Sequence, residues 1–324
     1  MPTMNPSIAN PVGARRPRPV RTALAAVTLL MLAGLALPHS ARATLLVYEP
    51  FEYSPGGLAG ASGGSGWSGN WVTHATPRFQ VVTGSLAYPA GSPIASSGSS
   101  LARTDSTGQS SAATRTYNAS TLFGGDMWFS FLIEPSSTNT GSDFRMQPLA
   151  RSNANNGNFA GGLGVFASGA NKEIQARIGA TQGNNVPLPD NQTTLVVGRV
   201  ALPNALGGSA TVDIWLDPDQ SFASLGAPDS TVTVANLGSA TGAANLTEFN
   251  TAYFRYGLGW AGGYDELRIG TSFAAVAMPE PTRAMLLAIA GLGLLARRRR
   301  SSTMPASRCP KTRHPTQASR AQRS

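Results

Sequence analysis

The 324-residue sequence combines 41% hydrophobic residues with only 13% charged residues, and it holds 36 glycines and 23 prolines. Low charge with many turn-forming residues favours an exported β-rich protein over a helical enzyme. The net charge of +9 does not indicate nucleic-acid binding, because residues 44–277 hold 10 basic and 15 acidic residues, a net charge of −5. The two ends carry the other 15 basic residues and one acidic residue, so we expect no basic patch for nucleic acid on the body.

Residues 1–43 have the layout of a secretory signal peptide. Several arginines precede an apolar stretch at 22–38, and Ala41 and Ala43 form a small-x-small cleavage site. An uncleaved membrane anchor is the alternative, but the break at Pro38 and the alanine pair favour cleavage after Ala43. We therefore expect a signal helix that is removed on export.

Export favours disulfide bonds, yet the single cysteine, Cys309, lies far beyond the predicted body of the protein. The body then depends on its hydrophobic core for stability, and its length is sufficient to bury a sizeable one.

Between the two ends, apolar and β-branched runs recur at short spacing, separated by glycine, asparagine, proline and serine. In ATVDIWL (210–216), Val212 and Ile214 are predicted to face one side of a strand, and Asp213 and Trp215 the other. This period of two predicts half-buried strands of antiparallel sheets, and no stretch keeps a helical period. The predicted strands lie within 79–88, 127–137, 161–169, 173–179, 193–202, 210–219, 230–237 and 264–273. We expect an all-β antiparallel β-sandwich over 44–277, with about a dozen strands and no helices.

Three segments of the body carry a resemblance to a known family. They are LLVYEPFEYSPGGLAGASGGSGWSGNW (45–71), GGDMWFSFLIEP (124–135) and GYDELRIGTSFAAV (263–276). Their order and character resemble bacterial surface proteins with a concanavalin A-like, LamG-type jelly roll. The resemblance implies a jelly-roll fold over most of residues 45–277, and it leaves room for a calcium ion.

The stretch MPEPTRAMLLAIAGLGLLARRRR (278–300) joins a proline-rich turn, an apolar run and a basic stop. It resembles the PEP-CTERM sorting signal, with Pro279, Glu280 and Pro281 matching the tripeptide and Arg297, Arg298, Arg299 and Arg300 the basic stop. The arginines would hold the helix end at the cytoplasmic side of the inner membrane and leave the body outside. The resemblance implies recognition by an exosortase-type transpeptidase, removal of the tail, and delivery to the cell surface or the extracellular matrix.

The signal departs from its family in two respects. The apolar run at 284–296 has 13 residues, whereas a helix needs roughly 18–20 to cross a bilayer. A simple inner-membrane anchor is therefore the alternative to processing. Residues 301–324 form a basic tail with no apolar periodicity, for which we expect disorder. The tail is either a cytoplasmic extension or an out-of-frame one.

Catalytic patterns are absent from the body. His74 is its single histidine, and no nucleophile elbow accompanies it. A glycosidase needs two carboxylates that face one substrate. In a strand, Glu49 and Glu52 would point to opposite faces, and so would the adjacent Asp265 and Glu266. We therefore predict no enzymatic activity.

Asp213, Asp217 and Asp219 form the densest carboxylate group of the body, and calcium binds six to eight oxygen ligands. Their string lacks the glycine and bidentate glutamate of a calcium loop, so solvated acids beside a turn are the favoured interpretation. No cofactor is predicted, with Ca²⁺ as the alternative.

Tryptophan rings can stack on sugar rings. Trp67, Trp71 and Trp260 lie in glycine-rich loops, where they could bind polysaccharide or cover the ends of the sandwich. Trp128 and Trp215 lie within strands, so we expect them to pack in the core.

Together these features predict a non-enzymatic, exported cell-surface or matrix protein. A carbohydrate-binding module for exopolysaccharide or environmental glycans is the second hypothesis, and a glycoside hydrolase is the third.

Overall fold

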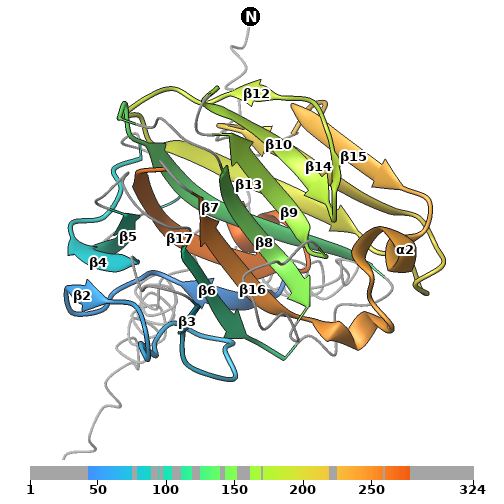
Figure 1. Cartoon of the computed structure of the whole chain (residues 1–324), viewed down its shortest axis with the longest axis horizontal. Helices are drawn as coiled ribbons and strands as arrows, with labels where there is room; N and C mark the ends of the chain where they lie inside the picture. The colour runs from blue at the N-terminus through green and yellow to red at the C-terminus, as the bar shows by residue number, and fades with distance from the viewer. Residues whose placement is uncertain are drawn as a thin grey trace, which may run out of the picture.

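Alternating apolar residues along the strands build two antiparallel sheets that pack face to face (Figure 1). The structure is a computed structural model. It describes residues 43–74, 79–88, 94, 98–103, 111–118, 125–138, 143–151, 161–168, 171–218, 225–257 and 260–277. The predicted antiparallel β-sandwich is confirmed.

The nine-stranded sheet has the order β15-β14-β13-β7-β17-β5-β4-β2, and β1 pairs with β17 outside this path. Its strands are β1 (Leu45–Glu49), β2 (Gly56–Gly57), β4 (Gln80–Thr83), β5 (Ser99–Arg103), β7 (Asp126–Pro135), β13 (Thr194–Ala201), β14 (Ala210–Leu216), β15 (Ser230–Val234) and β17 (Gly262–Gly270).

The eight-stranded sheet has the order β11-β10-β9-β8-β16-β6-β3, and β12 pairs with β10. Its strands are β3 (Val72–His74), β6 (Ser111–Thr116), β8 (Asp143–Arg151), β9 (Leu163–Ser168), β10 (Glu173–Ile178), β11 (Thr181–Gln182), β12 (Val186–Pro187) and β16 (Phe249–Tyr256). In Figure 1 the strands β8, β9 and β16 lie side by side in the front layer.

The core lies between the sheets and is filled by side chains from both. Phe129 and Phe131 of β7 enter it from one sheet, and Phe144 of β8 and Phe254 of β16 enter it from the other. Since side chains alternate along a strand, the residues between them lie on the outer faces. The predicted alternation in β14 is confirmed, because Val212 and Ile214 are core residues while Asp213 and Trp215 are not.

The body also contains short helices, which corrects the expectation that it has none. They are α2 (Leu237–Thr241), the 3₁₀ helix η1 (Leu246–Glu248) and α3 (Phe273–Ala277). Asn236 begins α2, since its side-chain oxygen accepts from the backbone N–H of Ser239 at 2.9 Å. Gly242 ends the helix in the left-handed conformation, with a φ of 67°. At five and three residues, these segments are too short to show a helical period in the sequence.

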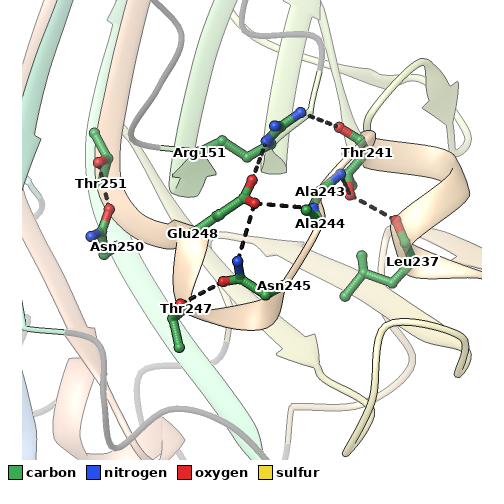
Figure 2. Close-up of polar contacts among 10 residues, drawn as sticks. All are labelled: Arg151, Leu237, Thr241, Ala243, Ala244, Asn245, Thr247, Glu248, Asn250 and Thr251. Atoms are coloured by element: carbon green, nitrogen blue, oxygen red, sulfur yellow. Dashed lines mark hydrogen bonds and ion pairs between the residues drawn. The ribbon is translucent and has the colours of Figure 1, made fainter.

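Figure 2 shows how the connection from β15 to β16 is fixed. The Nε–H of Arg151, at the end of β8, donates to the Glu248 carboxylate at 2.7 Å, and the backbone N–H of Ala244 donates to the same carboxylate at 3.1 Å. A terminal nitrogen of Arg151 also donates to the carbonyl of Thr241 at 3.4 Å. The chain therefore enters β16 from a position tied to the neighbouring strand β8.

A second apolar cluster lies on the outer face of the nine-stranded sheet. Trp128 and Trp215 stack there with ring centroids 5.7 Å apart, and Phe273 of α3 lies 5.7 Å from Trp128. Trp128 packs with the buried residues Leu132 and Leu195 of this cluster. Trp215 is buried, at 6% exposed, as expected, and Trp128 is partly buried. The expectation is corrected in one respect, because both rings lie on the outer side of the sheet and not in the core between the sheets.

Among the described residues, no helix is both long and apolar enough to span a membrane. The predicted signal helix and the apolar run at 284–296 lie outside the residues that the structure describes.

Candidate functional site

Two of the three candidate stacking tryptophans lie inside the protein. Trp71 is 1% exposed and Trp260 is 0% exposed. Phe51 stacks on Trp71 at 6.0 Å between ring centroids, and Phe144 stacks on Trp260 at 5.5 Å. This corrects the expectation that their faces could meet a sugar, because protein side chains already cover them.

Trp67 keeps part of its surface exposed and belongs to a buried polar network. The guanidinium carbon of Arg115 lies 4.7 Å from the centre of the Trp67 ring. Arg115 forms a 2.6 Å ion pair with Glu49, and the indole N–H of Trp71 donates to the same carboxylate at 2.9 Å. The hydroxyl of Tyr53 donates to it as well, at 2.7 Å. Trp67 therefore packs against the core beside this network.

The predicted acidic group does not assemble into a metal centre in the described part of the chain. Asp213 pairs with Arg199 at 2.8 Å and accepts from the hydroxyl of Thr231 at 2.6 Å. Asp217 accepts from the backbone N–H of Leu195 at 2.8 Å. Asp219 lies outside the described residues. No group of three or more potential metal ligands occurs within the residues described.

Asp265 and Glu266 share one face of β17, which corrects the expectation that they point oppositely. The pairing of β17 with β7 shifts between Asp265 and Arg268, and Glu266 has a φ of 56°. Such a bulge inserts one residue and reverses the alternation. Asp265 accepts from the hydroxyl of Ser85, and Glu266 accepts from the hydroxyl of Tyr48 at 3.0 Å. Their exposed fractions are 0% and 2%, so no substrate reaches them in this conformation.

Glu49 is fully buried and Glu52 is exposed, but β1 ends at Glu49, so the two residues do not lie on one strand and the expected alternation between them does not apply. His74 ends β3 at the edge of the eight-stranded sheet, where its Nε2 lies 3.0 Å from the hydroxyl of Thr114. Ala43 is exposed at the start of the described chain. Ala41, Pro279, Glu280, Pro281 and Arg297 to Arg300 lie outside the described residues.

The outer face of the eight-stranded sheet carries a cluster of arginines that the sequence did not single out. Arg145 of β8 is the direct cross-strand neighbour of Arg255 on β16 and of Phe166 on β9. Arg177 of β10 approaches the same ring, with its guanidinium carbon 4.9 Å from the centre of Phe166, while that of Arg145 lies 5.7 Å away. We call this group the arginine face and define it as Asp143, Arg145, Phe166, Arg177, Tyr253 and Arg255.

One carboxylate serves two of these arginines. Asp143 pairs with Arg145 at 2.8 Å and with Arg255 at 3.6 Å. The Nε–H of Arg177 donates to the carbonyl of Gly179 at 2.6 Å, and no carboxylate of the described residues lies within ion-pair distance of its guanidinium. Glu173 of β10 also lies on this side of the sheet, in the row of Ser168 and Asp143. Among the described residues, the three arginines therefore exceed the two carboxylates Asp143 and Glu173 by about one positive charge, in a body whose sequence is mildly acidic.

Burial makes this excess charge costly. The pKa of Arg177 is lowered to about 10, first by burial and then by the nearby charge of Arg145. Only 13% of the Arg145 side chain and 20% of the Arg255 side chain remain exposed. Guanidinium groups recessed in this way interact more strongly with an anion than fully solvated ones do, because less water screens them.

Tyr253 and Gln147 are cross-strand neighbours on the same outer face, in the row next to Arg145 and Arg255. Both are fully buried. Burial raises the pKa of Tyr253 to about 12, although the charges of Arg255 and Arg145 oppose this shift. Neither side-chain polar atom of Gln147 has a hydrogen-bond partner among the described residues. A tyrosine with a raised pKa and no exposure is poorly suited to proton transfer at neutral pH.

The sequence did contain a weak signal for this face. In DFRMQ (143–147), EIQARI (173–178) and YFR (253–255), polar or aromatic side chains alternate with core residues. Each segment alone reads as an ordinary half-buried strand. Only the order of β10, β9, β8 and β16 in the sheet brings the three arginines together.

No protein-family profile and no curated protein sequence matches the chain. It is similar in structure to the endo-β-1,4-glucuronan lyase of the fungus Trichoderma reesei, with a TM-score of 0.41, 16% identity, and coverage of 72% of this chain and 98% of the lyase. The globular domain of Trypanosoma cruzi calreticulin gives a TM-score of 0.43 at 13% identity, with coverage of 78% and 95%. A PL-14 alginate lyase from Aplysia kurodai gives 0.39 at 9% identity, with coverage of 60% and 87%. With TM-scores below 0.5, these likenesses carry no argument about ligand or activity.

Proposed function

We propose that this chain is a non-enzymatic, exported surface or matrix protein whose sandwich binds polysaccharide through the arginine face. The observation that carries the proposal is the convergence of Arg145, Arg177 and Arg255 around Phe166 with a single carboxylate among them. Like charges directly opposite each other on neighbouring strands are destabilising. Arrangements that cost stability are concentrated at functional sites.

The layout of the face suits an extended ligand. The row that runs through Phe166 continues from Gln175 on β10, through Arg145, Arg255 and Ala112, to His74 on β3. Six neighbouring strands span roughly 24 Å at about 4.8 Å per strand. Planar side chains with several donors, set beside an aromatic ring, fit the hydroxyl-rich faces of linked sugars.

The non-enzymatic part of the proposal rests on the absence of a suitable acid and base at this face. Among the described residues, Asp143 is held by two arginines, Glu173 accepts from the side chain of Asn185, and Tyr253 is buried. The export part rests on the signal-peptide pattern and on the likeness of 278–300 to a sorting signal. The jelly-roll body would be displayed outside the inner membrane, and an exosortase-type enzyme would remove the tail.

A panel of immobilised polysaccharides, neutral and acidic, tests the binding proposal. The wild-type protein should bind at least one member, and Phe166→Ala should weaken that binding while thermal unfolding stays cooperative. Trp67→Ala is the matched control, because this ring lies at another part of the sandwich. Loss of binding in Trp67→Ala alone would relocate the site, and no binding to any member would refute the proposal.

Mass spectrometry of the mature surface protein tests the sorting proposal. In a host that has an exosortase, peptides from 284–300 should be missing from the mature protein. Their retention would contradict processing and leave a simple inner-membrane anchor as the explanation.

A further inference from the structure

The geometry of Arg177 points to carboxylate-bearing sugars as the ligand class, an inference that rests on the proposed function. We infer that the arginine face binds linear polyuronates, and that Arg177 is the residue that receives a sugar carboxylate. Neutral glycans of the same backbone would then bind much more weakly.

The Arg177 guanidinium is held in place by only one of its donor groups. Its Nε–H is held by the carbonyl of Gly179, and Gly179 itself has a φ of 57° in the turn that follows β10. The two terminal nitrogens have no hydrogen-bond acceptor among the described residues, whereas Arg145 is engaged by Asp143. The fork of donors on Arg177 is therefore oriented and unoccupied, as required for a planar carboxylate bound by two parallel hydrogen bonds.

The negative charge of Asp143 lies on the side of Phe166 away from Arg177. Asp143 sits beside Arg145 and Arg255 on one side of Phe166, and Arg177 approaches Phe166 from β10 on the other. Asp143 thus pairs with Arg145 and Arg255, whereas no carboxylate of the described residues pairs with Arg177. A ligand carboxylate on Arg177 would offset the repulsion from Arg145 that contributes to the lowered pKa of Arg177.

The surface of β9 next to Arg177 carries no side chain at the paired position. Gly164 is the cross-strand partner of Arg177, so no side chain stands beside the guanidinium on β9. A Cβ atom at Gly164 would lie 2.3 Å from the carbonyl oxygen of Met146, and its φ is 156°. Glycine is thus required at this point, and it leaves backbone rather than a side chain next to Arg177.

Sodium alginate and polygalacturonate, each compared with its carboxyl-reduced neutral counterpart, test the inference. The purified full-length protein should bind at least one of the acidic polymers, and carboxyl reduction should lower the affinity by roughly ten- to a hundredfold, the range expected for hydrogen bonds to a charged group. Binding should weaken as sodium chloride rises, because salt screens the attraction between the charged polymer and the arginine face, although less than it would for fully exposed charges.

Substitutions of Arg177 test whether this residue causes the preference for acidic over carboxyl-reduced polymers. Arg177→Gln should abolish the preference for the acidic polymer, while Arg177→Lys should retain only part of it, since lysine keeps the charge but lacks the planar fork. Arg199→Gln, on the outer face of the other sheet, removes the same charge and should leave the preference unchanged. Thermal melts of all variants confirm that each is folded.

The outcomes distinguish polysaccharide binding in general from a preference for carboxylate-bearing sugars. Equal affinity for acidic and reduced polymers would overturn the inference and leave polysaccharide binding in place. Tighter binding to dextran sulfate than to either polyuronate would overturn the carboxylate class. Failure to bind any acidic, reduced or neutral polymer would overturn both the inference and the proposed function.

Discussion

Arg145 and Arg255 face each other as direct cross-strand neighbours on β8 and β16, with a single aspartate, Asp143, between them. Two like charges at opposed positions of a sheet lower its stability. The arrangement is therefore informative, because a sheet selected only for stability would place a neutral or acidic residue at one of the two positions.

Removing one of these charges should not harm the fold. Arg255→Gln relieves the repulsion and leaves Asp143 paired with Arg145, so the free energy of unfolding should stay equal or rise by up to about 1 kcal/mol. Urea unfolding at low salt measures this. Arg199→Gln is the comparison, because it breaks the Arg199–Asp213 pair and relieves no repulsion. A loss of more than about 1 kcal/mol in Arg255→Gln would show that the arginine is structural.

The buried pair of Glu49 and Arg115 should matter far more to stability. Glu49→Gln leaves the Arg115 guanidinium buried without its anion and weakens the hydrogen bonds from Trp71 and Tyr53. Breaking a buried pair in this way costs about 3–5 kcal/mol. Chemical unfolding of the variant gives the value. Glu52→Gln, three residues away and exposed, should change stability by less than about 0.5 kcal/mol. Similar small effects in both variants would contradict the assigned network.

Asp265 should make the protein more stable in mild acid. Burial raises the pKa of its carboxyl to about 7 and the neighbouring Glu266 contributes, whereas hydrogen bonds from Ser85 and Leu86 oppose the shift. The folded state therefore binds the proton more tightly than the unfolded state does. The stabilisation is complete below the unfolded-state pKa of about 4 and is lost as the pH rises through 7. The loss amounts to at most about 4 kcal/mol for this group.

Thermal unfolding at pH 5 and pH 8 measures this effect, with Asp265→Asn as the matched variant. Asparagine keeps an oxygen to accept from the backbone N–H of Leu86 but does not ionise. The wild type should lose more stability between the two pH values than the variant does. An identical pH dependence in both proteins would show that Asp265 does not ionise in this range.

Gln147 is fully buried, with no hydrogen-bond partner for its amide among the described residues. Gln147→Met, which has a similar shape, should raise the free energy of unfolding by about 1–2 kcal/mol, because an unsatisfied buried polar group is replaced by an apolar one. Gln147→Glu should destabilise strongly, since it buries a charge. Calorimetry measures the unfolding stability of both variants. A clear loss of stability in Gln147→Met would indicate that the amide has a hydrogen-bond partner.

The sequence predicts the inward faces of clearly alternating strands, because alternation is a local property. Val212 and Ile214 illustrate this. The runs named as strands do not include β6, β8 and β16 of the eight-stranded sheet. The shared face of Asp265 and Glu266 was not predictable, since a bulge depends on pairing with β7 and leaves no clear mark in the local pattern. For Trp71 and Trp260 the sequence left two alternatives open, sugar binding or packing at the ends of the sandwich, because glycine-rich surroundings are compatible with both.

The arginine face also could not be predicted from the sequence, for a related reason. Arg145 and Arg177 lie on strands separated by β9, and Arg255 follows much later in the chain. Their meeting is a property of strand order, which sequence patterns of single strands do not encode. The predicted sorting signal is a different case, because the residues that carry its resemblance, 278–300, are contiguous in the sequence. It stays a prediction, since these residues lie outside the part of the chain that the structure describes.

Backbone hydrogen–deuterium exchange, with and without saturating sodium alginate, tests the central claim most directly. The account predicts slower exchange in peptides from β8, β9, β10 and β16, which carry the arginine face, and unchanged exchange in β13, β14 and β15 of the other sheet. The Arg177→Gln variant should lose this protection. Protection confined to the nine-stranded sheet or to the segment around Trp67, or no protection at all, would contradict the assignment of the arginine face as the polysaccharide-binding surface.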